Sequence, residues 1–245
     1  KPLADYLPRL STLTFQEHLG SMLDKNNRVA GVVESVGELL GMVGTDIATA
    51  KTASAVLKAD LATHMVVELT SLQGVMGREY AKLGGMPSEV ATAISEHWQP
   101  RSAGDNTPAS FAGALLAIAD RLDSLVGLFA AGLAPKSTAD PYGLRRAALG
   151  IIQILADKKI STDLRALITK LAEAQPIAVS DEVKASVLDF IGGRLRVWLG
   201  EQGYSTDIIN AVLAQQTHNP YQATINVAQL TEWVKRDDWA VVLDN

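Results

Sequence analysis

The stretch from Glu89 to Leu155 decides how the chain folds: EVATAISEHWQPRSAGDNTPASFAGALLAIADRLDSLVGLFAAGLAPKSTADPYGLRRAALGIIQIL. Its longest segment, Ala109–Ala131, carries apolar side chains every three or four residues, which is the pattern of a helix with one buried face. These side chains are Phe111, Leu115, Ile118, Leu122, Leu125 and Phe129. A shorter helix is predicted at Ser88–Trp98, before a loop rich in Pro, Gly, Asn and Asp. A third is predicted to begin at Asp140-Pro141, because Asp caps helices and Pro is tolerated in their first turn.

The same spacing predicts helices along most of the remaining chain, and no segment shows the alternation of a strand. Pro2 and Pro8 are expected to break any early helix. One helix is predicted to start at Arg28, and the next to run from an Asp46 cap to Leu69. Later helices are expected after a Ser161 cap and near Ser180–Gly200, Ser205–Gln215 and Tyr221–Arg236. The fold class is therefore predicted to be all-α.

One segment stands out as an internal boundary. It reads AEAQPIAVS and has Pro176 near its centre, where proline interrupts the helical pattern. We therefore expect a helical domain over residues 1–175 and a smaller helical segment over residues 176–245.

Composition limits the class of protein. The chain has 245 residues and no cysteine, which excludes disulfides, thiolate zinc sites and cysteine nucleophiles. No apolar run approaches the roughly 18 residues of a membrane span, and no signal peptide opens the chain, so we expect a cytoplasmic protein. The net charge of −5 argues against non-specific nucleic-acid binding over the whole surface. Because the first residue is Lys1 rather than Met, we expect a piece of a longer protein.

Motifs for common chemistry are missing from the sequence. There is no glycine-rich phosphate loop, no His-Glu-x-x-His pair and no Gly-x-Ser-x-Gly elbow. A metal site would therefore have to be assembled across helices. The residues available for it are Asp60, His64, His97, Asp120 and Asp123.

Each of the main candidates also has a structural interpretation. His97 ends a predicted helix, where a cation is stabilised by the helix dipole. Asp60 fits a solvated helical acid. Asp120 is expected at a half-buried position, where pairing with a neighbouring arginine or capping a loop is commoner than metal binding.

A basic tract lies between Asp140 and Arg165. It contains five basic residues against three acidic ones on an otherwise acidic chain, and such local positive charge can contact phosphates. Its adjacent Arg145 and Arg146 are expected to point about 100° apart on a helix.

Long stretches of the chain resemble the β subunit of the bacterial heterotetrameric glycyl-tRNA synthetase. They are, in order, TFQEHLGSMLDKNNRV (residues 14–29), KADLATHMVVELTSLQGVMGREYA (residues 58–81), AISEHWQPRSAGDNTPASFAGALLAIADRLDSLVGLFAAG (residues 93–132) and DPYGLRRAALGIIQIL (residues 140–155). The collinear match covers roughly residues 14–155, with weaker likeness to the end.

The resemblance implies a role in joining glycine to its tRNA. The family's enzyme contains two α and two β subunits, uses ATP with Mg²⁺ on the α subunit, and employs β mainly for tRNA recognition. The expected partners are tRNA-Gly, the α subunit and a second β subunit, and no cofactor is expected in this portion. An anticodon-binding helical domain would follow the residues present here.

This portion of the family is similar to the HD superfamily, helical metal phosphohydrolases named for a His-Asp dyad. The resemblance implies an HD-like helical bundle over residues 1–175. The dyad position falls on Ala59-Asp60, so its histidine is replaced by alanine. The helix that normally supplies the first histidine, Arg28–Gly41, has none. His97 falls at the accessory histidine and Asp120 at the closing aspartate, which implies a degenerate site that has lost hydrolysis.

Three functions remain open from the sequence. The leading hypothesis is a non-catalytic tRNA-contacting and scaffolding module, with Arg145 and Arg146, then Arg101 and Lys158, on the phosphates. The second is a metal-dependent phosphohydrolase using Asp60, His97 and Asp120. The third is a purely structural helical spacer. His64, one turn after Asp60, is the residue that would have to substitute for a lost histidine ligand.

Overall fold

The computed structural model describes residues 1–102 and 104–236, so the last nine residues of the expected C-terminal segment lie outside it. In chain order the elements are η1 Leu3–Thr12, β1 Thr14–Gln16, β2 Gly20–Ser21, α1 Met22–Leu39, α2 Gly44–Ser54, η2 Ala59–Ala62, α3 His64–Glu68, η3 Thr70–Leu72, α4 Val75–Leu83, α5 Ser88–Glu96, α6 Phe111–Ala130, α7 Leu144–Asp157, α8 Leu164–Glu173, α9 Asp181–Glu201, α10 Thr206–Gln216 and α11 Pro220–Trp233. None of these helices combines the length and apolar character needed to cross a bilayer.

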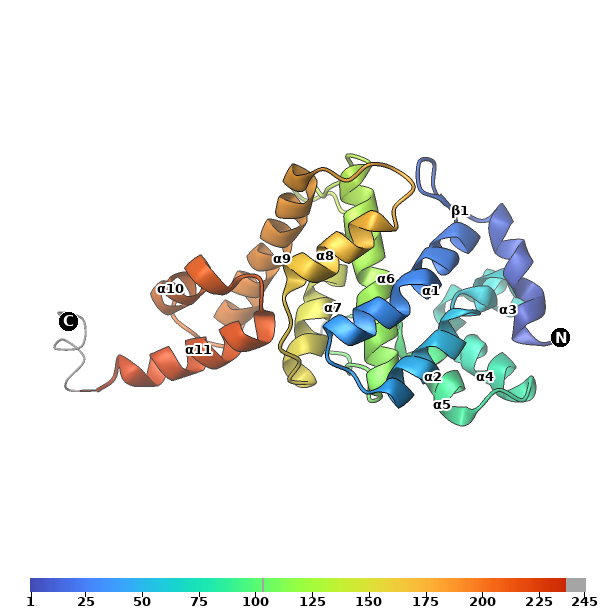
Figure 1. The fold of residues 1–245 in the computed structure, drawn as a ribbon, viewed down its shortest axis with the longest axis horizontal. Helices are drawn as coiled ribbons and strands as arrows, with labels where there is room; N and C mark the ends of the chain where they lie inside the picture. The colour runs from blue at the N-terminus through green and yellow to red at the C-terminus, as the bar shows by residue number, and fades with distance from the viewer. Residues whose placement is uncertain (103, 237–245) are drawn as a thin grey trace.

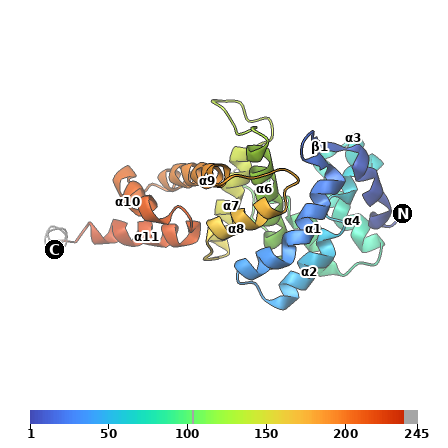
Figure 2. The same ribbon diagram turned by 45° about the horizontal axis from the view of Figure 1, so that its top comes forward.

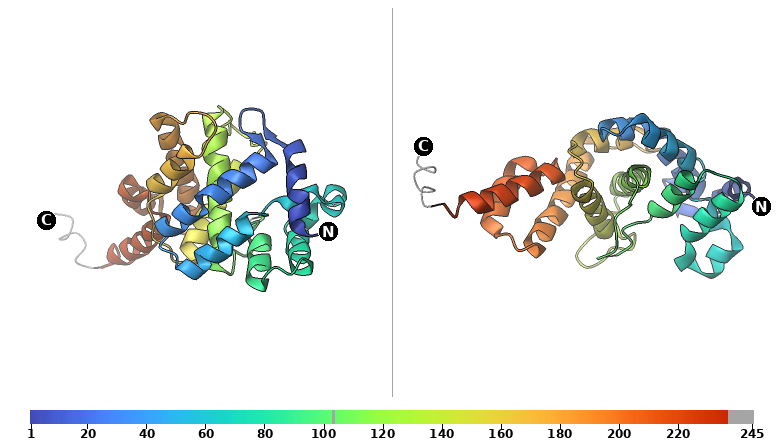
Figure 3. Two further views of the ribbon diagram at one scale, coloured as in Figure 1. Left: turned by 45° about the vertical axis from the view of Figure 1, so that its right-hand side comes forward. Right: turned by 90° about the horizontal axis from the view of Figure 1, so that it is seen from below.

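Helix α6 is the centre of the molecule. It contacts α1, α2, α5, α7, α8 and α9, and 15 of its 20 residues are buried. Figure 1 shows it in green between α1 and α7, and Figure 3 shows it nearly end-on with the other helices around it. The sequence prediction of this helix is confirmed, apart from Phe111, which is 43% exposed because it is the first helical residue.

Helix α1 begins earlier than its apolar pattern predicts. Ser21 caps it: the Ser21 hydroxyl accepts from the Asp24 amide at 3.2 Å, and the Asp24 carboxylate accepts from the Ser21 amide at 2.7 Å. The extra turn adds Lys25 and Asn26 to the buried face. Because both side chains are polar, the apolar spacing that starts near Arg28 could not include them.

A small antiparallel hairpin corrects the expectation of a chain without strands. Thr14 pairs with Ser21 and Gln16 with Gly20. Gly20 has a φ of +85°, where a Cβ would lie 2.5 Å from an Asp24 carboxylate oxygen. The reversal therefore depends on a glycine directly before the helix cap, a local signal that the search for period-2 strands does not detect.

The predicted single helix from Asp46 to Leu69 is wrong, because α2 ends at Ser54. The Asn26 side chain from α1 takes over the hydrogen bonds at the break: its amide donates to the Ser54 carbonyl at 3.1 Å, and its oxygen accepts from the Lys58 amide at 3.0 Å. The chain then turns through η2, and both Lys58, directly before it, and Asp60, within it, are buried.

Helix α7 starts at Leu144, after Gly143 in the left-handed conformation, and not at Asp140-Pro141 as predicted. Asp140 nevertheless satisfies the new helix end, because its carboxylate accepts from the amides of Leu144 at 2.8 Å and Arg145 at 2.9 Å.

The C-terminal helices extend the bundle at one end. Helix α9 packs on α6, α7 and α8, while α10 and α11 contact each other and reach the rest through α9 and α7. Figure 2 shows α10 and α11 at the opposite end of the molecule from η1. The division of the chain at residues 175 and 176 stays a prediction.

Candidate functional site

A group of buried charged side chains lies where α1, α5 and α6 meet the segment after α2. The Lys58 ammonium is central: its Nζ is 2.8 Å from Asp120 Oδ2, 3.0 Å from His97 Nε2 and 3.9 Å from the centre of the Trp98 ring. We call the group the buried charge cluster. Its members are Lys25, Arg28, Lys58, Asp60, His97, Asp120, Arg121 and Asp123.

His97, the residue that follows α5, is a neutral base. It is 1% exposed, and its Nδ1 is hydrogen-bonded to the Ile94 carbonyl, which can only accept. Nδ1 therefore carries the proton, and Nε2 accepts from the Lys58 ammonium. Burial lowers the pKa of His97 well below 6.5, and the Lys58 charge lowers it further. The interpretation of His97 as a cation beside the helix dipole is wrong for this reason.

Asp120 lies between two ammonium groups. Its Oδ2 accepts from Lys58, and its Oδ1 is 3.3 Å from Lys25 Nζ. Burial would raise the pKa of Asp120, but these two ammonium groups outweigh burial and hold it well below its usual range. Burial lowers the pKa of Lys58 against the pull of Asp120. Asp120 is thus an ionised, paired carboxylate, and its partners are lysines rather than the predicted arginine.

Asp123 ties α1 to α6 from a fully buried position. Its carboxylate accepts from Lys25 Nζ at 2.9 Å and from Arg28 Nε and Nη2 at 2.8 and 3.2 Å. The Gln175 amide, from the segment after α8, donates to the same carboxylate at 3.0 Å. Burial would raise the pKa of Asp123, but Lys25 and Arg28 bring it below 3.8.

Asp60 is completely buried, so the interpretation of a solvated acid is wrong. Its Oδ2 accepts from the backbone amides of Gly74 at 2.6 Å and Gly77 at 3.1 Å. Its Oδ1 has no hydrogen-bond partner among the described residues. Burial raises the pKa of Asp60 above 3.8. The carboxyl group therefore fastens the segment that leads into α4.

A pocket of about 510 Å³ opens above this cluster. Arg121 lines it, and its guanidinium donates to the backbone carbonyls of His97, Trp98 and Pro100 at 3.0 to 3.2 Å. The residues around the pocket include Gln73, Trp98, Arg101, Asp120, Ser124, Tyr142 and Arg146. Three arginines and two aromatic rings thus face one opening.

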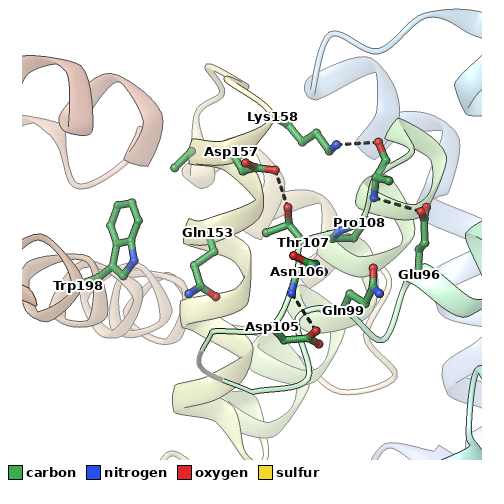
Figure 4. Close-up of a pocket in the computed structure, with 12 residues that line it drawn as sticks. Glu96, Gln99, Asp105, Asn106, Thr107, Pro108, Gln153, Asp157, Lys158 and Trp198 are labelled. Atoms are coloured by element: carbon green, nitrogen blue, oxygen red, sulfur yellow. Dashed lines mark hydrogen bonds between the residues drawn. The ribbon is translucent and has the colours of Figure 1, made fainter. Parts of the chain in front are cut away.

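A second pocket, of about 790 Å³, lies between the loop before α6, the end of α7 and Trp198 of α9 (Figure 4). Lys158 lines it, and its ammonium donates to the Ala109 carbonyl at 2.7 Å. The carboxyl groups of Glu96, Asp105 and Asp157 also face this pocket. Lys158 is therefore separated from the three arginines and surrounded by acids.

The structure brings together two sets of predicted site residues. Asp60, His97 and Asp120 share the buried charge cluster, and Arg101 and Arg146 share the pocket above it. Arg145 turns away to the Ser137 carbonyl.

The cations of the cluster were missed from the sequence. They are Lys25, Arg28, Lys58 and Arg121. The available signal was indirect: buried carboxylates require cationic or amide partners. Arg28, Lys58 and Arg121 each lie beside a residue of the apolar helical pattern, whereas Lys25 lies between Asp24 and Asn26, outside that pattern.

The comparisons with known proteins agree on one family. The glycyl-tRNA synthetase beta subunit family matches residues 1–214. This chain belongs to that family. It is 44% identical over 219 residues to the glycine–tRNA ligase beta subunit of Actinobacillus succinogenes, and equally so to that of Haemophilus influenzae, covering 89% of this chain and 31% of each relative. It is 42% identical over 221 residues to the glycine–tRNA ligase beta subunit of Salmonella schwarzengrund, and the match covers 90% of this chain and 32% of the relative.

The chain spans about a third of the length of these curated relatives of the glycyl-tRNA synthetase beta subunit family. The matched region includes the whole buried charge cluster and the pocket above it, because both lie within residues 1–214. The described site therefore lies within the residues that the family match covers, whereas α11 lies beyond them.

Proposed function

We propose that this chain is a tRNA-contacting and scaffolding part of a glycyl-tRNA synthetase beta subunit, without a catalytic centre of its own. The observation that carries the proposal is the pocket lined by Arg101, Arg121 and Arg146 together with Trp98 and Tyr142. Guanidinium groups bind phosphates, and aromatic rings stack on unpaired bases, so this combination suits RNA more than a small neutral ligand.

The charges beneath the pocket support an anionic ligand. Four cationic side chains of the buried charge cluster face three carboxyl groups, and His97 is neutral, so the cluster keeps at least one net positive charge. Arg121 donates to backbone carbonyls, so it shapes the pocket. Arg146 makes no ion pair within the described ranges and is exposed, which leaves its guanidinium available for a phosphate.

The four predicted contact residues contribute unequally to this proposal. Arg101 and Arg146 are its main contacts, because both line the pocket; one nitrogen of the Arg101 guanidinium donates to the Gln73 carbonyl. Arg145 has a smaller part, because its guanidinium donates to the Ser137 carbonyl and it does not line the pocket. Lys158 also has a smaller part, since it lies in the other pocket beside acidic side chains.

The wider assignment is also a proposal. The relatives are named glycine–tRNA ligase beta subunits, so the partners would be tRNA-Gly, an α subunit and a second β subunit in the cytoplasm. The α subunit would use ATP with Mg²⁺ for glycylation. Residues 1–175 would form an HD-like bundle, an idea supported by the meeting of Asp60, His97 and Asp120 in one cluster.

The test is a titration of fluorescent tRNA-Gly with the chain at low and physiological salt. Replacing Arg101 and Arg146 together by alanine should weaken binding at least about 10-fold and reduce the salt slope by about 1 to 2, because each lost phosphate contact removes about 0.7 to 0.9. The matched control replaces Arg165 and Lys170 on α8, two exposed cations away from the pocket, and should change the slope less.

Two results would contradict the proposal. If binding is salt-insensitive, or equally weakened by the α8 control, the pocket is not the phosphate contact. If the folded wild-type chain does not bind tRNA-Gly at all, a purely structural spacer explains it better. A metal phosphohydrolase is less favoured than either, because no described group of three His, Asp or Glu side chains is placed to hold a metal ion.

A further inference from the structure

The strongest unassigned feature is the coordination of the Lys58 ammonium. Lys58 is 2% exposed, although lysine is among the residues least often buried. Its Nζ meets a carboxylate oxygen, an imidazole nitrogen lone pair and the face of an indole ring at 2.8, 3.0 and 3.9 Å. All three groups attract cations. The interior is therefore built around one positive charge, which is supplied by a side chain.

The same donors do not fit a divalent ion. A neutral imidazole nitrogen and a carboxylate are ordinary ligands for Mn²⁺, Zn²⁺ or Ni²⁺, but here both are directed at Nζ. The nearby Asp60 carboxylate is turned toward the Gly74 and Gly77 amides. An ion entering between His97 and Asp120 would have to displace a covalently attached ammonium group and would be repelled by it.

We propose that Lys58 is a built-in cation that takes the place of a metal ion between His97 and Asp120 and fixes the position of the Trp98 segment. This inference concerns the interior of the bundle and does not depend on RNA binding.

The consequence reaches the pocket through two connections. The Lys58 ammonium contacts the His97 ring and the Trp98 indole. Independently, the Arg121 guanidinium donates to the carbonyls of residues 97, 98 and 100. Trp98 packs against Gly74, where a side-chain carbon would collide with the indole, so the ring has little freedom. Lys58 is thus a positioning residue for the wall of the pocket.

The first experiment measures metal binding by the whole chain. The wild-type protein is equilibrated with Mn²⁺, Zn²⁺ or Ni²⁺ in turn, and bound metal per chain is measured after dialysis, with His97→Gln and Asp120→Asn as controls. We expect the wild type to bind no metal ion at this position, so neither substitution should lower the amount of bound metal per chain. One ion per chain that both substitutions remove would overturn the proposal.

A spectroscopic measurement tests the same point without a mutation. In ¹⁵N spectra of the wild-type chain, His97 should remain neutral with its proton on Nδ1, and added Mn²⁺ should leave its ring signals sharp. Broadening of these signals by stoichiometric Mn²⁺ would contradict the proposal.

The second experiment removes the charge. Lys58→Met keeps a similar chain length without the ammonium, and it should lower the folding equilibrium constant by on the order of 100-fold, because Asp120 loses a buried partner. The control is Lys51→Met on α2, whose ion pair with Glu34 is half exposed and whose loss should cost less than about 5-fold. Equal effects in the two variants would refute a central role for the Lys58 charge.

A double variant keeps the test decisive if Lys58→Met does not fold. In Lys58→Met/Asp120→Asn the unpaired carboxylate is gone, and the new amide can donate to His97 Nε2. The double variant should fold, and its folding equilibrium constant should be at least about 10-fold higher than the product of the two single effects predicts. If the double variant is no more stable than the two single effects combined predict, Lys58 and Asp120 do not act as a charge pair, which would contradict the proposal.

Discussion

The sharpest stability prediction concerns Asp123, the fully buried carboxylate that joins α1 to α6. Asp123→Asn preserves the shape but removes the charge and presents an NH₂ donor to the donors of Lys25 and Arg28. The side chains of Lys25 and Arg28 are only 4% and 9% exposed, so water cannot replace the lost acceptor.

The magnitude follows from these contacts. Breaking a buried ion pair by changing one partner costs about 3–5 kcal/mol. Lys25 retains the Ser124 hydroxyl at 2.8 Å and the Asp120 carbonyl at 3.1 Å, so the expected loss is at the lower end. We expect a decrease of about 3 kcal/mol in the free energy of unfolding, or about 6–12 °C in the melting temperature for a domain of this size.

The assay is urea unfolding followed by circular dichroism near neutral pH. The matched control is Glu34→Gln, also on α1, whose ion pair with Lys51 is exposed and whose loss should cost less than about 1 kcal/mol. The reasoning would be refuted if Asp123→Asn, with an unchanged denaturant slope, cost no more than the control.

Two further predictions use α1 and α5. Gly31→Ala should raise the free energy of unfolding by about 0.5–1 kcal/mol, because the new Cβ would meet nothing within 4 Å. Gly37→Ala should lower it by about 1–3 kcal/mol, because the new Cβ would lie 2.7 Å from the Ile47 side chain. Thermal melts that show the same change for both variants would contradict this prediction. Below pH 6.5, the ordinary pKa of histidine, His97 takes up a proton in the unfolded chain but not in the folded chain. The free energy of unfolding should therefore decrease as the pH is lowered, by about 1.4 kcal/mol at about pH 5.5 relative to neutral pH. His97→Gln should remove that part of the slope, and identical pH profiles of unfolding would rule out the buried neutral imidazole.

The sequence predicted the helices where a local signal was sufficient. The apolar spacing of Ala109–Ala131 identifies α6, because a helix buried on nearly every side needs a continuous run of small and apolar residues. Element ends were less accurate, since Ser21 and Asp24 form a cap without an apolar pattern beside it. The end of α2 could not be predicted, because the side chain that replaces its hydrogen bonds, Asn26, comes from another helix.

The candidate site divides in the same way. Asp60, His97 and Asp120 could be singled out because carboxylates and imidazoles are metal-ligating groups and because the family resemblance places all three at HD positions. Their chemistry could not be predicted, because it depends on Lys58, which looks like an ordinary surface lysine in the sequence. Only packing brings its ammonium within 3.0 Å of His97 and 2.8 Å of Asp120.

By itself, the sequence determined that the chain is mainly helical, that α6 is its central helix and that it resembles the glycyl-tRNA synthetase beta subunit. These properties depend on periodicity and on the order of residues along the chain. The tertiary structure alone decided which charges are buried together and which cations surround one pocket. The physical reason is that the free energy of a charge depends on its neighbours in space and on its distance from water, and side chains from four separate segments set both for Lys58.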